Sequence, residues 1–276
     1  MIRLLFALCL AVISSVSLAA SPKPYELTGQ FVQGGLVFGK TAPGSTVTFE
    51  GKSIRVSKEG EFLFGFGRDY KKTAMLVVSH PNGKSYNQEI GVARRQYKIE
   101  RVDGLPPSKV SPSEEFLKRI RRENAEIARI RAVDTPKKWF QSGWVWPAHG
   151  RISGVYGSQR VLNGIPKRPH FGVDVAAATG TDVWASTDGV VRMAEKDLFY
   201  TGGTIMIDHG FGLVSVYSHL SKLTVESGDI VKQGQKIGEI GATGRATGPH
   251  LDWRLNWFKE RLDPELLLGP MPNSDS

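Results

Sequence analysis

The chain has 276 residues, of which 40% are hydrophobic and 23% charged, and its formal net charge is +9. This length accommodates two modest domains, and the balance of apolar and charged residues excludes a disordered or low-complexity protein. The excess of positive charge is typical of a protein with an acidic partner, although solubility alone would also explain it.

The N-terminus predicts an exported protein. Arg3 gives a basic start, residues 4–13 form an apolar centre, and residues 17–19 are a small-residue cleavage site, so we interpret residues 1–19 as a secretory signal peptide. An uncleaved anchor is the competing interpretation, but the segment is short for a membrane span. No later stretch is long and apolar enough to cross a membrane, so no transmembrane segment is expected after signal removal.

The cysteine content points to the same compartment. The only cysteine, Cys9, lies inside the signal, so the mature protein has no disulfide and no cysteine-bound metal. Export without disulfides is typical of a bacterial envelope protein. It argues against nucleic acid as the acidic partner and favours cell-wall peptides or anionic lipid.

Residues 20–105 predict a β domain. Short alternating or apolar runs are separated by turn signals, and their spacing predicts an immunoglobulin-like sandwich. The runs are Thr46–Phe49, Ser53–Val56, Phe62–Phe66 and Met75–Val78. His80 precedes a turn and has no histidine or cysteine near it in the sequence, so we expect a spacer or docking role here.

Residues 106–138 predict a linker helix. Ser111 is the expected N-cap, Pro112 suits the first helical position, Glu114 completes a capping box, and Pro136 ends the helix. An apolar stripe predicts that the helix packs on one domain, where it could also cover a functional site. The stripe consists of Phe116, Ile120, Ile127 and Ile130.

From residue 139 to the C-terminus the pattern returns to β, and glycine-rich turns separate the runs. The expected strands are Thr204–Asp208, Leu213–Ser218, Lys236–Ile240 and Leu251–Asn256. The chain is therefore predicted to be mainly β, with a sandwich, a helix and a C-terminal antiparallel sheet domain.

The run RPHFGVDVAA carries the clearest chemical signal, because His170 and Asp174 lie four residues apart around Gly172. In an extended strand these three positions share a face, and glycine leaves room for two ligands to converge on an ion. His250 and Asp252 share a face in the same way. Imidazole and carboxylate are donors that a catalytic zinc takes, with one position left open for water.

Together with YSHLS around His219, the order and spacing of these motifs resemble the lysostaphin/LytM-type zinc metallopeptidases, which cut peptide cross-bridges of bacterial cell wall. The resemblance implies an antiparallel sheet domain that binds one zinc ion. It implies that His170 and Asp174 are the first two zinc ligands, and that His219 and His250 are the catalytic histidines. The family's third ligand is a histidine in His-x-His, and this sequence has Asp252 there.

The resemblance covers roughly residues 146–256 and implies a murein endopeptidase, with D-alanine–meso-diaminopimelate as the expected bond in a Gram-negative periplasm. Aspartate is a legitimate zinc ligand, but a His/Asp/Asp set makes a divalent site formally neutral where His/Asp/His would keep one positive charge. We therefore expect metal-assisted hydrolysis that is slower, or less selective for zinc. One of His219 and His250 would take the water proton, and the other would hydrogen-bond the oxyanion.

Other polar and aromatic residues receive smaller roles. Arg160 and Asn163 fall where the family's substrate-lining loop begins and are candidates for binding a carboxylate or an amide. His209 precedes a hairpin turn and His149 lies in a loop, so both are interpreted as structural. Trp253 and Trp257 share the strand face opposite His250 and are expected in the core.

Two alternative functions remain. Related envelope proteins with damaged metal sites activate cell-wall amidases, and Asp252 makes such a regulator, with other cell-wall enzymes as partners, the main alternative. Residues 225–241 also resemble the hairpin of lipoyl and biotinyl carrier domains. The residues that flank the modified lysine in those carriers are absent here, which argues against a carrier.

Overall fold

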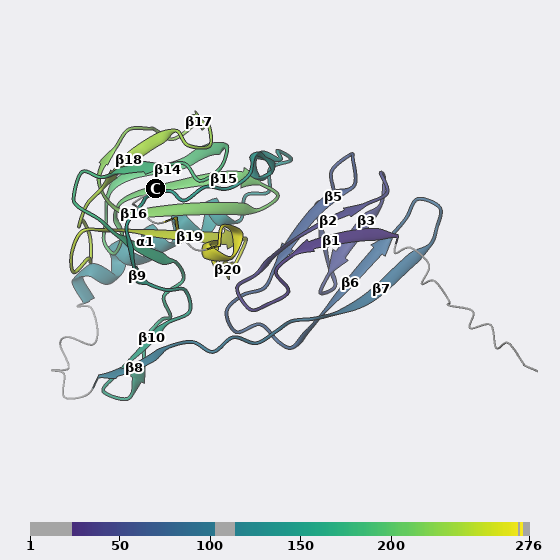
Figure 1. Ribbon diagram of the computed structural model, residues 1–276, viewed down its shortest axis with the longest axis horizontal. Helices are drawn as coiled ribbons and strands as arrows, with labels where there is room; N and C mark the ends of the chain where they lie inside the picture. The colour runs from purple at the N-terminus through teal and green to yellow at the C-terminus, as the bar shows by residue number, and fades with distance from the viewer. Residues whose placement is uncertain (1–23, 103–113, 270, 273–276) are drawn as a thin grey trace, which may run out of the picture.

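The computed structural model describes residues 24–102, 114–269 and 271–272, and these residues form mainly antiparallel β-sheets (Figure 1). The expected signal peptide, and the expected helix cap at Ser111 and Pro112, lie outside the described residues. Among the residues described, no helix combines the length and apolarity that a membrane span requires.

The N-terminal strands form two antiparallel sheets, with the orders β1–β2–β5 and β4–β3–β6–β7. Their bounds are β1 Tyr25–Gly29, β2 Leu36–Thr41, β3 Thr46–Phe49, β4 Lys52–Ile54, β5 Glu61–Gly65, β6 Thr73–Ser79 and β7 Ser85–Gly91. Val37 and Phe64 from the first sheet share one buried apolar core with Val47 and Leu76 from the second. The alternating patterns therefore bury one face of each sheet against the other.

The position of β4 differs from the immunoglobulin constant arrangement, in which the fourth strand pairs beside the fifth. Here β4 pairs with β3. The cause is the turn between them, where Glu50 and Gly51 both have positive φ, 48° and 72°. Two such residues form the tight turn that joins neighbouring strands of a hairpin, so β4 stays on the sheet of β3.

Strand β8 (Ile99–Val102) lies near the end of the expected first domain. It pairs in parallel with β10 (Gln159–Leu162), which forms a hairpin with β11 (Ile165–Pro166). Figure 1 shows β8 and β10 side by side, away from the N-terminal sheets. The expected first domain, residues 20–105, thus ends in a strand that belongs to a sheet of the C-terminal half. Parallel pairing between distant segments leaves no local signal in the sequence.

The C-terminal domain is built on a ten-stranded sheet with the main order β17–β14–β15–β16–β19–β12–β9. The bounds are β9 Arg151–Gly154, β12 Val173–Ala176, β13 Asp182–Trp184, β14 Gly189–Leu198, β15 Gly202–Gly210, β16 Leu213–Leu223, β17 Ile230–Val231, β18 Lys236–Ile240, β19 His250–Trp257 and β20 Glu260–Leu262. Short 3-10 turns cover Trp139–Ser142 and Pro264–Leu267. All four strands predicted in this half are confirmed.

The two faces of this sheet differ in what covers them. On β19, Leu251 and Trp253 enter the main core of the domain. Helix α1 (Glu114–Arg131) packs on the other face, where Ile127 and Ile130, together with Val216 of β16, pack against a small buried cluster that includes Val214. Because Val216 lies directly opposite Arg254, and Ser218 opposite Asp252, the helix covers part of the face that carries the candidate ligands. The prediction that the helix packs on one domain is confirmed.

The two halves of the chain share an apolar core. Phe211, Leu213, Leu255, Trp257 and Leu262 from the C-terminal half lie in the same buried cluster as the sandwich core. The rings of Phe49 and Trp257 are 5.8 Å apart. Arg95 also binds the buried carboxylate of Asp263 at 2.6 Å. The N-terminal half is therefore packed firmly against the sheet rather than tethered as a free spacer.

Candidate metal centre

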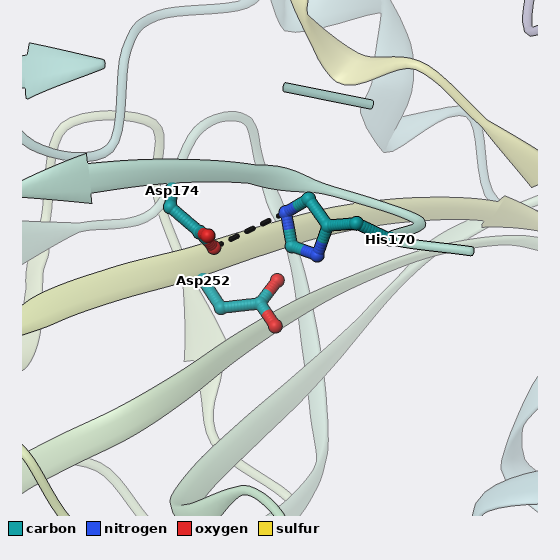
Figure 2. A group of neighbouring side chains, drawn as sticks. All are labelled: His170, Asp174 and Asp252. Atoms are coloured by element: carbon teal, nitrogen blue, oxygen red, sulfur yellow. Dashed lines mark ion pairs between the residues drawn. The ribbon is translucent and has the colours of Figure 1, made fainter. Parts of the chain in front are cut away.

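Three of the predicted site residues converge in one place. Figure 2 shows His170 at the end of a loop, Asp174 on β12 and Asp252 on β19. His170 Nε2 lies 3.2 Å from Asp174 Oδ1, and one potential ligand atom from each of the three residues falls within 4.8 Å of the others. Ligands arranged tetrahedrally around zinc at about 2.0–2.2 Å lie about 3.3–3.6 Å apart, so a small inward movement closes the group on an ion.

Strand register explains how the two carboxylates meet. β12 and β19 are antiparallel neighbours, and Asp174 is directly opposite Asp252. His170 is not part of a strand, contrary to the sequence expectation. It is fixed by its backbone instead: its N–H donates to Ser158 O and its carbonyl accepts from Gly157 N, both at 2.8 Å.

Two glycines make room for the group. A Cβ atom on Gly172 would lie 2.7 Å from Asp252 Oδ1 and 2.6 Å from Arg254 Cγ. A Cβ on Gly154, in the neighbouring strand β9, would lie 2.1 Å from Asp174 Oδ2. Neither position tolerates a side chain without moving a candidate ligand, as the sequence predicts for Gly172.

The donor set fits a divalent cation. His170 Nε2 and Asp174 Oδ1 are buried, face each other and have no hydrogen-bond partner within the described part of the chain. Buried polar atoms nearly always have a hydrogen bond, so a nitrogen and an oxygen that have only this ion pair with each other at 3.2 Å are what a cation site presents. Burial lowers the pKa of His170, but the close contact with Asp174 and the charges of Asp252 and Asp174 outweigh burial and raise it overall.

His219 and His250 lie beside this group, with their ring centroids 4.7 Å apart. His219 Nδ1 lies 2.8 Å from Thr243 O, and His250 Nδ1 lies 2.8 Å from Gly248 O. Because a carbonyl oxygen only accepts, each Nδ1 carries the proton and each Nε2 keeps its lone pair in the neutral ring. His250 Nε2 is 4.0 Å from Asp174 Oδ1, so its free nitrogen faces the candidate ligands.

The backbone of His219 is also unusual. Its φ is +67°, a conformation that costs a non-glycine residue energy and that occurs often at functional sites. The side chain is buried, and burial lowers the pKa of His219 below its usual value. The imidazole is therefore neutral at pH 7 and able to accept a proton.

Arg254 is the residue that the sequence analysis missed. Its Nε donates to Asp252 Oδ1 and Oδ2 at 2.9 and 3.0 Å, and its Nη2 also donates to Oδ2. Burial alone would raise the pKa of Asp252, but the charge and hydrogen bonds of Arg254 hold it well below the usual range. The signal was present, because residues 252 and 254 share a strand face.

This guanidinium adds a positive charge beside the ligands that the sequence argument counted. With Asp174 and Asp252 ionised and Arg254 cationic, the formal charges sum to −1, and a divalent ion brings the total to +1. The sequence argument counted only the ligands and reached a neutral site. The second carboxylate and the arginine together restore the charge of a His/Asp/His centre.

The predicted substrate residues lie on the hairpin next to His170. Arg160 is on β10, and Asn163 with Gly164 forms the turn to β11, with φ values of 48° and 76°. Asparagine followed by glycine is the preferred sequence for such a turn. This gives Asn163 a conformational role that is independent of any substrate.

The remaining histidines and tryptophans lie outside the group. His149 is exposed, edge-on to Trp184, and His209 is fully buried. His209 Nδ1 lies 2.7 Å from Asp188 O, and its Nε2 lies 2.7 Å from Ser215 Oγ, which makes it structural. The core positions predicted for Trp253 and Trp257 are confirmed.

Burial of His209 predicts loss of stability in acid. Burial lowers its pKa to about 4, whereas the unfolded chain has about 6.5. The stabilisation from the neutral ring is present above about pH 6.5 and is lost as the pH falls toward 4. The loss is on the order of 2 kcal/mol at pH 5. Urea unfolding at pH 8 and pH 5 measures it, and His209→Gln should flatten the pH dependence while lowering stability at pH 8. An equal slope in both proteins would contradict the assignment.

Comparison with known proteins relates the C-terminal half of the chain to peptidases. Residues 168–264 match Peptidase family M23. Peptidoglycan DD-endopeptidase ShyA of Vibrio cholerae is 45% identical over 107 residues, which cover 38% of this chain and 24% of ShyA. DD-carboxypeptidase/endopeptidase Mpg of Neisseria meningitidis is 39% identical over 105 residues, with 38% and 24% coverage. The matches span only about a quarter of the length of these relatives.

A solved structure resembles most of the chain. A Pseudomonas aeruginosa protein described as a peptidase M23 superposes with a TM-score of 0.67 and 29% sequence identity. The match covers 87% of this chain and 96% of that one. The likeness therefore extends well beyond residues 168–264 and includes elements of the N-terminal half.

Proposed function

Because residues 168–264 form a domain of Peptidase family M23, we propose that the protein is an exported, zinc-dependent endopeptidase that hydrolyses peptide cross-links of peptidoglycan. The observation that carries the proposal is the convergence of His170, Asp174 and Asp252 beside the His219–His250 pair. The names of the relatives support peptidoglycan as substrate. The bond we propose joins D-alanine to meso-diaminopimelate in the periplasm of a Gram-negative bacterium.

His170 Nε2 and one oxygen each from Asp174 and Asp252 would hold the ion, one per chain. A zinc ion bound there supplies a Lewis acid that polarises the scissile carbonyl and lowers the pKa of water. Asp174 and His170 are held by β12 and by the loop hydrogen bonds to residues 157 and 158, so the ligands are largely preorganised.

The two histidines move the protons. Thr243 O and Gly248 O fix both rings with Nδ1 protonated, which leaves the Nε2 atoms of His219 and His250 available. One Nε2 accepts the proton of the attacking water. A protonated ring then donates to the oxyanion or to the departing amine. An amidase regulator would have no chemical need for this pair.

Digestion of purified cross-linked sacculi tests the proposal. We expect the zinc-loaded protein to release uncrosslinked muropeptides, detected by chromatography, and a chelator to stop the release until zinc is restored. A protein that binds zinc but releases no muropeptides, while it stimulates a cell-wall amidase, would overturn the proposal in favour of the regulator.

A further inference from the structure

We propose that Arg254 is a positioning residue of the metal centre. It orients the Asp252 carboxylate, and its positive charge compensates the negative charge of aspartate at a ligand position that a neutral side chain would otherwise occupy. The inference rests on the proposed function, since it takes His170, Asp174 and Asp252 as the cation site. The pairing of two side chains on β19 carries it.

The geometry fixes the carboxylate plane. Arg254 contacts both oxygens of Asp252 through Nε and Nη2, and a guanidinium fork of this kind sets orientation as well as charge. The side chain of Asp252 is 4% exposed and that of Arg254 30% exposed. The carboxylate is thus buried under the guanidinium, which separates it from solvent on that side.

Gly172, directly before strand β12, leaves room for this pair. The Arg254 stem passes so close to Gly172 that a Cβ there would lie 2.6 Å from its Cγ. The same Cβ would lie 2.7 Å from Asp252 Oδ1. Gly172 therefore accommodates the arginine and the carboxylate together.

Asp252 can bind a cation while it remains bound to Arg254. A carboxylate offers about four acceptor positions, and the guanidinium uses those on its own side. An oxygen of Asp252 lies within 4.8 Å of the ligand atoms of both His170 and Asp174. This is the arrangement of a metal ligand with an outer hydrogen-bond partner, whose loss typically weakens metal binding about 10–100-fold.

Nearby cations disfavour other positions for the guanidinium. Arg131, at the end of α1, is partly buried, and its Nη1 has no hydrogen-bond partner within the described part of the chain. Burial, with contributions from Arg168 and Arg254, lowers the pKa of Arg131 to about 10. Because these like charges repel one another, Asp252 is the favourable partner for Arg254.

The test is a double-mutant cycle on zinc affinity, measured at pH 7 by competition with a chromophoric chelator. In the parent, Arg254→Met should weaken binding about tenfold, because the buried carboxylate loses its partner. In the Asp252→His background the same substitution should tighten binding, because an unpaired cation beside a neutral ligand repels the ion. A residue that only supported the fold would weaken binding in both backgrounds.

Two further variants sharpen the result. Arg254→Lys keeps the positive charge but loses the two-pronged hydrogen bonding of the guanidinium. We expect its zinc affinity to lie between those of the parent and Arg254→Met, and the two differences measure the contributions of orientation and of charge. Arg168→Met removes a guanidinium that lies over Phe171 and should change affinity less than Arg254→Met. Effects of equal sign in both backgrounds, or tighter binding by Arg254→Met in the parent, would overturn the Arg254 inference alone. Absence of zinc binding by the parent would instead refute the metal centre.

Discussion

His250→Ala should reduce muropeptide release from sacculi about 10³-fold while leaving zinc binding within a fewfold of the parent. His250 Nε2 faces Asp174 at 4.0 Å, yet His250 does not belong to the group of three candidate ligands. Loss of one acid–base group costs about 10²–10⁴ in rate. The measurement pairs initial rates of muropeptide release with zinc content after dialysis.

Two further histidine variants serve as controls for this result. His149→Ala removes an exposed histidine outside the site and should leave the rate unchanged. His170→Ala should lose both zinc and activity, because His170 Nε2 is the only nitrogen in the ligand group. If His250→Ala lost zinc as His170→Ala does, His250 would be a metal ligand. Asp252 would then only pair with Arg254 and would not bind the ion.

Local sequence patterns were sufficient to predict many of the elements. β3 and β18 have the predicted bounds, because alternating apolar residues between turn signals determine a strand without distant information. The motif spacing likewise predicted which residues meet at the site. His170 shows the limit, since a loop and not a strand holds it. The spacing identified the residues, but it did not show that backbone hydrogen bonds in a loop position His170.

Long-range pairing explains what was missed. The parallel contact between β8 and β10 joins segments about sixty residues apart, and the local sequence of neither strand indicates which strand it pairs with. The packing of α1 on the ligand face depends on which surface remains free once the sheet has formed. Arg254 is a different case. Its spacing from Asp252 was visible, but only the register that buries Asp252 shows that the carboxylate requires a cation.

Leu262→Ala should lower the free energy of unfolding by about 2–5 kcal/mol, the usual cost of a buried leucine cavity. Leu262 is 0% exposed on β20 and packs against Gly65 of the sandwich, where a Cβ would lie 2.6 Å from its Cδ2. The cavity therefore opens between the two halves of the chain. Urea unfolding followed by tryptophan fluorescence and circular dichroism measures the loss.

Met75→Ala is the matched control, because Met75 is 40% exposed on β6 and its truncation should cost well under 1 kcal/mol. A shared core predicts that both spectroscopic probes shift together in Leu262→Ala. A change below 1 kcal/mol, or a shift confined to one probe, would mean that the halves fold independently.

Leu262 lies opposite Leu255 on β19, the strand that carries His250 and Asp252. The sandwich thus stabilises, through this contact, the strand on which the candidate centre is built.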